Sequence, residues 1–206
     1  LSYLTLEQKI VVVGWMANEV INKTRGFEVE WVIQPKQTGN ADALSFGLTK
    51  LSNKVDTILV VQADDSAFYR SETLSGFLDF HCSESAIVSL MTVKKIEKTS
   101  RFQIIREGNL YRGIIKIPEG ESRENSVEFF TGCVCFTRSW LEKRITNIQP
   151  SDKGEISIPA LFEIARKESE KILVYQLKDS EEWIGINTKE QLAGAQKKWR
   201  SREIYY

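Results

Sequence analysis

Residues 57–66 read Thr-Ile-Leu-Val-Val-Gln-Ala-Asp-Asp-Ser, an apolar run that stops at two adjacent carboxylates. The first five side chains are apolar or β-branched, which is typical of a strand buried on both faces of a sheet. A parallel strand that ends in acids presents them where open α/β sheets bind ligands, outside the carboxyl end of the strand. Such oxygen ligands suit Mg²⁺. The alternative is that Asp64 and Asp65 only begin a turn or cap a helix starting near Ser71.

Strands and helices alternate on both sides of this stretch. Apolar runs predict strands at 9–14, 28–33, 57–62 and 86–93, and helical patterns lie between them at 18–24, 41–51 and 71–82. Short connections between alternating strands and helices are typical of a mostly parallel, doubly wound sheet. The first half of the chain therefore predicts a Rossmann-like sheet flanked by helices.

The pattern changes after residue 93. Glu107-Gly108-Asn109 is a turn of hairpin length between two runs that predict strands, 102–106 and 110–117. We expect further strands at 128–137 and 171–177 and helices at 139–144, 158–167 and 188–200. The predicted fold class is thus α/β: a Rossmann-like, mostly parallel sheet with a small antiparallel β lobe. Residues 1–206 are expected to form a single domain with two halves, 1–93 and 94–206.

Composition excludes several classes of function. The 206 residues carry 28 Lys plus Arg and 28 Asp plus Glu, so no net field favours nucleic acid or an anionic membrane. No apolar run approaches the length of a membrane span, and no signal-peptide pattern is present. The three cysteines make no disulfide framework, so we expect a reducing cytoplasm and cysteines that serve in packing. The single histidine, His81, has no catalytic partner in the sequence and is expected to be structural.

Two other segments could carry chemistry. Residues 34–43 join a strand to a helix through a loop, a geometry that receives phosphates or flat bases on backbone N–H groups. Gln34 offers both a donor and an acceptor, enough to read the edge of a base. The Ile-Gly-Ile run at 184–186 ends in Asn187, whose carbonyl oxygen could join a carboxylate at a metal. The alternatives are an ordinary turn for the first segment and a helix cap for Asn187.

The motifs follow one another in a defined order. They are Trp-Val-Ile-Gln-x4-Gly-Asn-Ala-x-Ala from residue 31, Ile-Leu-Val-Val-x-Ala-Asp from 58, Thr-Gly-x-x-x-Phe from 131, Gly-Glu at 154–155 and Gly-Ile-Asn at 185–187. This order resembles the sugar-phosphate nucleotidyltransferases, most closely the uridylyltransferase domain of N-acetylglucosamine-1-phosphate uridylyltransferase. The resemblance extends from about Ile10 to Trp199.

The resemblance implies a reaction and a set of site residues. A nucleotidyl group would pass from a nucleoside triphosphate, UTP or dTTP, to a sugar-1-phosphate with release of pyrophosphate. Mg²⁺ is the implied cofactor, and neither nucleic acid nor membrane is an implied partner. Residues 1–93 would be the nucleotide-binding half and 94–206 the sugar-binding half. The implied roles are nucleotide binding by Gln34, Gly39 and Asn40, sugar binding by Thr131, Gly132 and Glu155, and metal binding by Asp64, the catalytic acid, with Asn187.

The sequence departs from the family pattern in two ways. The family's glycine-rich loop ending in Thr-Arg or Thr-Lys, and its later Pro-Lys, do not occur. We therefore expect a fold lacking its first βα unit, an upstream segment of roughly 40–60 residues in the natural protein, and no activity from these residues alone. Phe102, Lys116 and Phe130 stand where the family has sugar-site residues, which would block or redirect sugar binding. The alternatives are a non-catalytic, regulatory homologue that binds nucleotide-sugar and a related metal-dependent glycosyltransferase.

Overall fold

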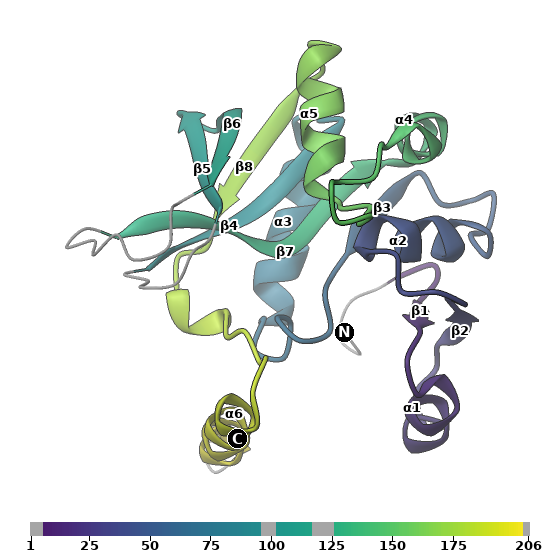
Figure 1. Ribbon diagram of the computed structural model, residues 1–206. Coiled ribbons are helices and arrows are strands. Elements are labelled where there is room, and N and C mark those ends of the chain that lie inside the picture. The colour runs from purple at the N-terminus through teal and green to yellow at the C-terminus, as the bar shows by residue number, and fades with distance from the viewer. Residues whose placement is uncertain (1–5, 96–101, 117–125, 204–206) are drawn as a thin grey trace. The chain divides into compact units, whose positions relative to one another are not determined.

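The computed structural model describes residues 6–95, 102–116 and 126–203, which form a mixed α/β fold (Figure 1). The elements match the predicted strands and helices to within about three residues at most ends. In chain order they are β1 (Ile10–Val13), α1 (Ala17–Lys23), β2 (Glu30–Ile33), α2 (Asn40–Leu48), β3 (Thr57–Val60), α3 (Ser71–Ser83), β4 (Val88–Lys95), β5 (Phe102–Glu107), β6 (Leu110–Lys116), β7 (Val127–Thr137), α4 (Arg138–Arg144), η1 (Ile145–Asn147), α5 (Pro159–Lys167), β8 (Ile172–Gln176), η2 (Ser180–Glu182) and α6 (Lys189–Glu203).

The strands form two sheets. β1 and β2 make a parallel pair with Val11 opposite Trp31. The other six strands follow the order β3-β7-β4-β8-β6-β5, and β5 also pairs with β7, which closes a circuit of pairings. β5 runs antiparallel to β6 and β7, and β6 antiparallel to β8, so the predicted antiparallel lobe is present. Among the described residues, no strand joins the β1–β2 pair to β3. The expected lack of a first βα unit stays a prediction.

The chain divides into two compact units, each assembled from segments far apart in sequence. Unit 1 contains the described parts of 1–58, 81–89 and 135–172, and unit 2 those of 59–80, 90–134 and 173–206. Several boundaries fall inside strands, so a single strand such as β7 contributes residues to both units. Each unit therefore needs chain segments from both halves of the sequence.

The core of unit 1 includes one face of α5 and the junction of β7 with α4. Leu161, Phe162 and Ala165 are fully buried, following the spacing of one helical face. Burying a side chain such as Phe162 contributes about 1.5–3 kcal/mol to stability. Trp140 stacks on Phe136 with ring centroids 6.4 Å apart. These contacts give unit 1 an apolar interior beneath its loops.

The core of unit 2 centres on its portion of β4. Leu90, Met91 and Val93 have no exposed surface, as expected for a strand covered on both faces. Phe77 on α3 is equally buried, and its ring lies 5.4 Å from that of Tyr175 on β8. The apolar run predicted at 86–93 is thus confirmed as a strand. The run at 57–61 was predicted to be buried on both faces, and this is wrong: β3 stands at the end of the strand order among the described residues, and of its residues only Ile58 is buried.

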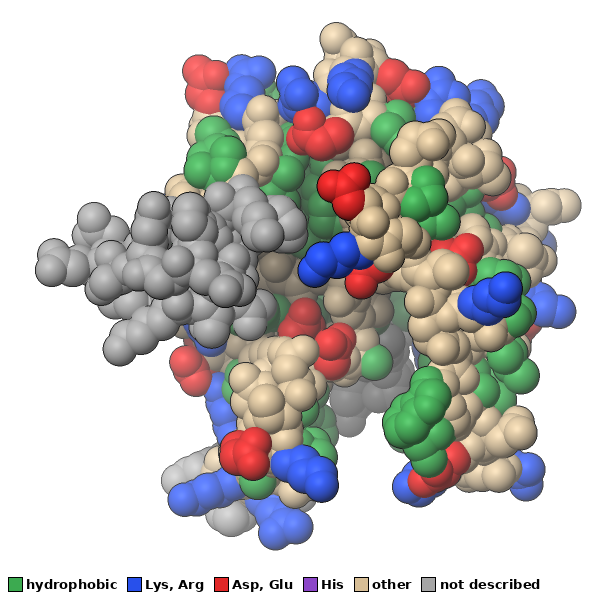
Figure 2. Space-filling view, viewed as in Figure 1, with side chains coloured by type: hydrophobic (Ala, Val, Ile, Leu, Met, Phe, Trp, Pro, Cys, Tyr) green, Lys and Arg blue, Asp and Glu red, His purple; other side chains and the backbone are tan. Residues whose placement is uncertain are grey.

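Apolar side chains also gather on the surface built by β1, α1 and β2 (Figure 2). Trp15 is 78% exposed and Phe27 67% exposed, and Val20 and Ile33 are exposed as well. These large side chains lie on or beside the three elements and are exposed, so they are not part of the core of unit 1.

The cysteines and the histidine are mostly buried, as the sequence suggested. All three cysteines are free, and Cys133 and Cys135 are buried in β7. Cys82 is exposed, so the prediction of a packing role is wrong for that residue. His81 is buried, with its Nδ1 atom 2.9 Å from Ser89 Oγ. In the described part of the chain, no helix is long and apolar enough to cross a membrane.

Stability is expected to fall in mild acid through His81. Burial lowers the pKa of this imidazole from 6.5, because the charged form loses its hydration. As pH drops below 6.5, the unfolded chain takes up the proton before the folded chain does. The contribution of His81 to the free energy of unfolding is therefore complete above pH 6.5. It is lost as the pH falls from 6.5 towards the lower pKa of the folded state.

Urea unfolding at a series of pH values checks this expectation. The difference in unfolding free energy between the wild-type chain and His81→Gln should narrow as the pH is lowered, since only the wild type carries this titration. A difference that stays constant across the series would show that His81 has the same pKa in both states.

Candidate functional site

The loop from β2 to α2 holds Gln34 in a fixed orientation within unit 1. The Gln34 side chain is buried, and its Nε2 donates to the Gly39 carbonyl at 3.2 Å and to Asp42 Oδ2 at 2.7 Å. The Thr38 hydroxyl donates to the same carboxylate oxygen at 2.6 Å. Asp42 stands in the first turn of α2, where a negative charge is favoured by the helix dipole. The loop is therefore organised around one carboxylate.

Gly39 allows a close approach between this loop and residues before α5. Its φ is +127°, and a Cβ at this position would lie 2.2 Å from the Ile156 carbonyl oxygen. Ile156 N–H donates to the Thr38 carbonyl at 2.8 Å, and Ala41 N–H donates to the Ile156 carbonyl at 3.1 Å. Only glycine fits this contact without displacing backbone.

Asn40 and Glu155 lie at the same junction in unit 1. Asn40 Oδ1 accepts a hydrogen bond from Ile158 N–H at 2.8 Å, so its carbonyl oxygen is already engaged within the protein. Glu155 is exposed and precedes Ile156 directly, and its backbone N–H donates to Ser151 Oγ at 3.2 Å. The structure thus brings the three predicted nucleotide residues together and places Glu155, predicted for the sugar, on the segment that contacts them.

Asp64 and Asn187 are brought together in unit 2. Asp64 lies in an exposed turn after β3, and its backbone carbonyl accepts a hydrogen bond from Ile186 N–H at 3.0 Å. Asn187, the next residue, is exposed, and its backbone N–H donates to Gln191 Oε1 at 2.6 Å. Within the described ranges, neither the Asp64 carboxylate nor the Asn187 amide group has a side-chain partner. Two residues 123 positions apart thus carry side-chain oxygens at neighbouring backbone positions.

Thr131 and Gly132 lie on β7 in unit 2, where neighbouring side chains fix their backbone. Gly132 has φ of +82°, and a Cβ there would lie 3.3 Å from Asp65 Oδ2. The Thr131 carbonyl accepts from Trp183 Nε1 at 3.2 Å and from the Tyr69 hydroxyl at 3.4 Å. Burial raises the pKa of Tyr69, so its hydroxyl stays protonated and remains a donor. The peptide that links Thr131 to Gly132 is therefore held from two sides.

Replacing Trp183 by phenylalanine should destabilise the fold by about 1–3 kcal/mol. The substitution removes the N–H donor to Thr131 and leaves space in a site where only 3% of Trp183 is exposed. Trp199, which is 49% exposed, offers a matched control, because Trp199→Phe should cost under about 0.5 kcal/mol. Urea unfolding of the two variants measures the difference, and equal midpoints would contradict the role given to Trp183.

The oxygen donors of Asp64 and Asn187 suit a hard cation such as Mg²⁺. No cluster of three or more His, Cys, Asp or Glu side chains suited to a metal occurs among residues that the structure describes. Zinc usually needs such a cluster. Mg²⁺ commonly takes one or two protein oxygens and obtains the rest from phosphates and water. Asp64 and Asn187 match that second pattern.

The predicted departures at the sugar site are only partly visible. Phe130 is half-buried on β7 beside Thr131. The side chains of Phe102 and Lys116 lie outside the described part of the structure. The effect of these departures on sugar binding stays a prediction.

Asp42, Tyr69 and Trp183 were missed by the sequence analysis. Asp42 had one visible signal, because an acid in the first turn after a loop commonly bonds back to that loop. Tyr69 and Trp183 had none, since their contacts to Thr131 join residues 62 and 52 positions apart. Only the folded chain reveals these pairs.

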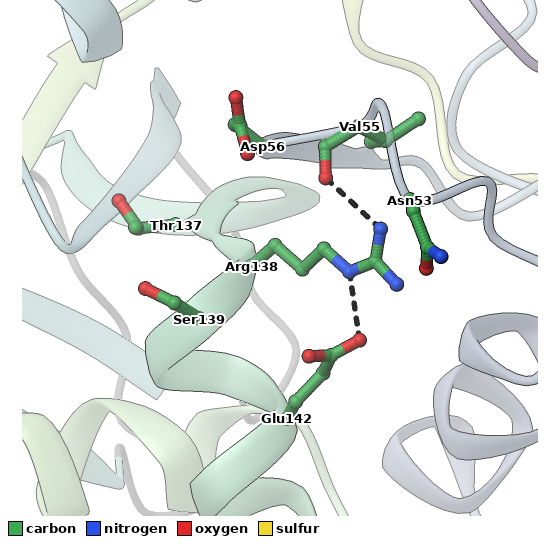
Figure 3. Close-up of a pocket in the computed structure, with 7 residues that line it drawn as sticks. All are labelled: Asn53, Val55, Asp56, Thr137, Arg138, Ser139 and Glu142. Atoms are coloured by element: carbon green, nitrogen blue, oxygen red, sulfur yellow. Dashed lines mark hydrogen bonds and ion pairs between the residues drawn. The ribbon is translucent and has the colours of Figure 1, made fainter.

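A separate pocket of about 560 Å³ opens in unit 1 (Figure 3). Figure 3 shows Arg138 reaching across it to the Val55 carbonyl, at 3.1 Å, and to Glu142, at 2.7 Å. Arg138 also donates to the Ser52 carbonyl. Its charge is thus used in holding residues 52–55 to α4, and none of the predicted site residues lines the pocket.

Two proteins of known name are similar to this chain over nearly its whole length. Bifunctional protein GlmU from Exiguobacterium sibiricum is 29% identical over 206 residues, covering 98% of this chain and 45% of that protein. Its counterpart from Geobacillus thermodenitrificans is 28% identical, with 98% and 44% covered. The chain thus spans less than half the length of these relatives.

Solved structures show the same fold. HddC from Yersinia pseudotuberculosis matches with a TM-score of 0.69 at 12% identity, covering 95% of this chain and 80% of that one. Apo UDP-glucose pyrophosphorylase matches with a TM-score of 0.65 at 16% identity, covering 94% and 81%. At these identities the likeness establishes the fold alone.

The family model described as nucleotidyl transferase matches residues 14–202, which include all eight predicted site residues. The match covers the loop at Gln34, the acid at Asp64 and the distant Asn187 in a single alignment. The chain belongs to the nucleotidyl transferase family.

Proposed function

We propose that the protein transfers a nucleotidyl group from a nucleoside triphosphate, UTP or dTTP, to a sugar-1-phosphate. A phosphate oxygen of the sugar-1-phosphate attacks the α-phosphorus, and the bond from that phosphorus to the bridging oxygen of the β-phosphate breaks. Pyrophosphate leaves, and a nucleotide-sugar forms. Such a reaction depends on alignment and charge neutralisation rather than on a protein nucleophile. This agrees with a site built from carboxylate, amide and backbone groups.

The observation that carries the proposal is the hydrogen bond from Ile186 N–H to the Asp64 carbonyl, at 3.0 Å. This bond joins the turn that contains Asp64 to the segment that ends in Asn187. Both side chains are exposed, and in the parts of the chain described both lack side-chain partners. Asp64 and Asn187 would hold Mg²⁺ through oxygen atoms. When bound, the cation neutralises charge on the phosphates.

The loop at 34–40 is assigned to the nucleotide. Gln34 and Gly39 would contact the base, and Asn40 would stand beside it. The fixed Gln34 orientation supports this assignment. The loop also leads into α2, whose N-terminus favours an anionic ligand.

The sugar is assigned to Thr131, Gly132 and Glu155. Gly132 would sit at the sugar, and the fixed Thr131 carbonyl supports a defined backbone there. Glu155 is exposed and has a carboxylate suited to a hydroxyl group. We keep the nucleotide-binding half at 1–93 and the sugar-binding half at 94–206 as part of this proposal.

The relatives support the chemistry at the level of ligand class. One solved neighbour of this fold is UDP-glucose pyrophosphorylase complexed with UDP-glucose, and another is HddC complexed with GMP-PN. The GlmU relatives are about twice the length of this chain, so the activity of the whole protein is proposed rather than transferred.

Two finer features belong to the proposal. One more βα unit would complete a Rossmann-like sheet, because in the described chain β1 pairs with β2 alone and β3 with β7 alone. A cytoplasmic location is supported by three free cysteines.

A pyrophosphate-release assay on the complete natural protein tests the proposal. Each of the common nucleoside triphosphates would be paired with a panel of sugar-1-phosphates in the presence of Mg²⁺. We expect release that requires both substrates and that is fastest with UTP or dTTP. Nucleotide binding without release from any pair would instead indicate a non-catalytic homologue.

A further inference from the structure

The Gln34 amide group has its two ends assigned by its neighbours. Its Nε2 lies 2.7 Å from Asp42 Oδ2 and 3.2 Å from the Gly39 carbonyl oxygen. A carboxylate and a carbonyl can only accept, so the group facing both of them must be the NH₂. Reversing the amide would set its oxygen against two other oxygens.

This arrangement changes what Gln34 can offer a ligand. Both N–H groups of the amide are used inside the loop, and its Oε1 has no hydrogen-bond partner within the residues described. Gln34 is therefore an acceptor only, although a free glutamine side chain is both donor and acceptor. Because its side chain is only 6% exposed, an unmatched acceptor here would be costly.

Thr38 strengthens the assignment. Its hydroxyl donates to the same Asp42 Oδ2 atom at 2.6 Å, which fixes the carboxylate that in turn fixes Gln34. Thr38, Gly39 and Asp42 all lie between Gln34 and the first turn of α2. The loop thus holds the Gln34 amide in one orientation through three hydrogen bonds: two from Gln34 and one from Thr38.

We propose that Asp42 is a specificity-determining residue, which locks Gln34 so that its carbonyl oxygen selects bases with a ring N–H. Uracil and thymine carry this donor at N3, and guanine carries it at N1. Cytosine and adenine have an unprotonated ring nitrogen at the equivalent edge, which would face Gln34 acceptor to acceptor. This inference rests on the proposed function, because it assumes that the loop binds a base.

Equilibrium binding of UTP and CTP, measured by calorimetry on the complete protein with Mg²⁺ and no sugar phosphate, tests the proposal. The wild type should bind UTP about 10-fold more tightly than CTP, or better. Asp42→Ala removes the shorter of the two contacts that orient the amide and leaves the longer one to the Gly39 carbonyl, so the ratio should fall clearly below the wild-type value. Asp152→Ala, which removes an exposed acid elsewhere in unit 1, should keep the wild-type ratio.

A second pair of variants tests the same contact by charge. Gln34→Glu places two carboxylates together and should weaken UTP binding about 10-fold or more. Adding Asp42→Asn to it supplies an N–H₂ donor to the new carboxylate and should recover part of the UTP binding, because an oxygen of that carboxylate still faces the Gly39 carbonyl. This pair also decides the matter if Asp42→Ala fails to fold.

The outcomes separate the two claims. Wild-type protein that binds no triphosphate would overturn the proposed function together with this inference. Wild type that prefers UTP, with an unchanged ratio in Asp42→Ala, would overturn the inference alone. Failure of the double variant to recover binding would also count against Asp42 as the residue that orients Gln34.

Discussion

Gly39→Ala is expected to destabilise the fold by about 2–4 kcal/mol and to weaken nucleotide binding strongly. Two costs combine at this position. A φ of +127° is unfavourable for any residue with a Cβ, and that atom would lie 2.2 Å from the Ile156 carbonyl oxygen. Relief of the clash requires separation of the loop from the segment before α5, which also moves Gln34. Urea unfolding and UTP calorimetry measure the two effects.

Gly26→Ala is the matched control. Gly26 also lies in unit 1, but a Cβ there meets nothing within 4 Å and its backbone does not need glycine. This variant should change stability by under about 1 kcal/mol, in either direction. If Gly39→Ala were as stable as Gly26→Ala, the close contact between loop and Ile156 would be contradicted.

Asp64→Asn should reduce turnover by at least about 100-fold while leaving stability within about 0.5 kcal/mol. The amide keeps the size of the side chain but removes the negative charge that would hold Mg²⁺. The fold should tolerate the change, because the Asp64 side chain is exposed and the Ile186 bond is made by its backbone. Initial rates over a range of Mg²⁺ concentrations, with unfolding curves, give both quantities.

Asp79→Asn provides a comparison, since Asp79 is an exposed acid on α3 in the same unit. It should keep wild-type rates and stability. Asp65→Asn extends the comparison to the adjacent acid, whose Oδ2 would lie 3.3 Å from a Cβ at Gly132. Loss of turnover in Asp65→Asn but not in Asp64→Asn would show that the wrong acid had been assigned.

The elements of this fold could be predicted because its strands are marked by apolar composition. The apolar runs that form β3 and β4 can be recognised as strands from their own residues, without knowledge of the strands they pair with. Pairing between strands could not be predicted in the same way. Nothing in residues 10–13 shows that, within the part of the chain described, β1 pairs with β2 alone, because pairing depends on which other strands are present.

The candidate site was predictable where residue type determines the chemistry. An acid at the end of an apolar strand and a glycine in a loop can be recognised in sequence as candidates, and the resemblance to the family then singled out Asp64 and Gly39. The hydrogen-bond partners of the polar side chains could not be predicted from the sequence. Sequence alone cannot show that Asn40 Oδ1 accepts from Ile158, or that Gln34 gives both its N–H groups to its own loop.

The central claim is nucleotidyl transfer to a sugar-1-phosphate, and the identity of the products tests it most directly. The complete protein would be incubated with UTP or dTTP, a sugar-1-phosphate and Mg²⁺, and the products followed by phosphorus NMR. We predict pyrophosphate and nucleotide-sugar in equal amounts, with neither formed when the sugar-1-phosphate is omitted. Formation of nucleoside monophosphate and pyrophosphate without nucleotide-sugar, or no reaction with any sugar-1-phosphate, would contradict the claim.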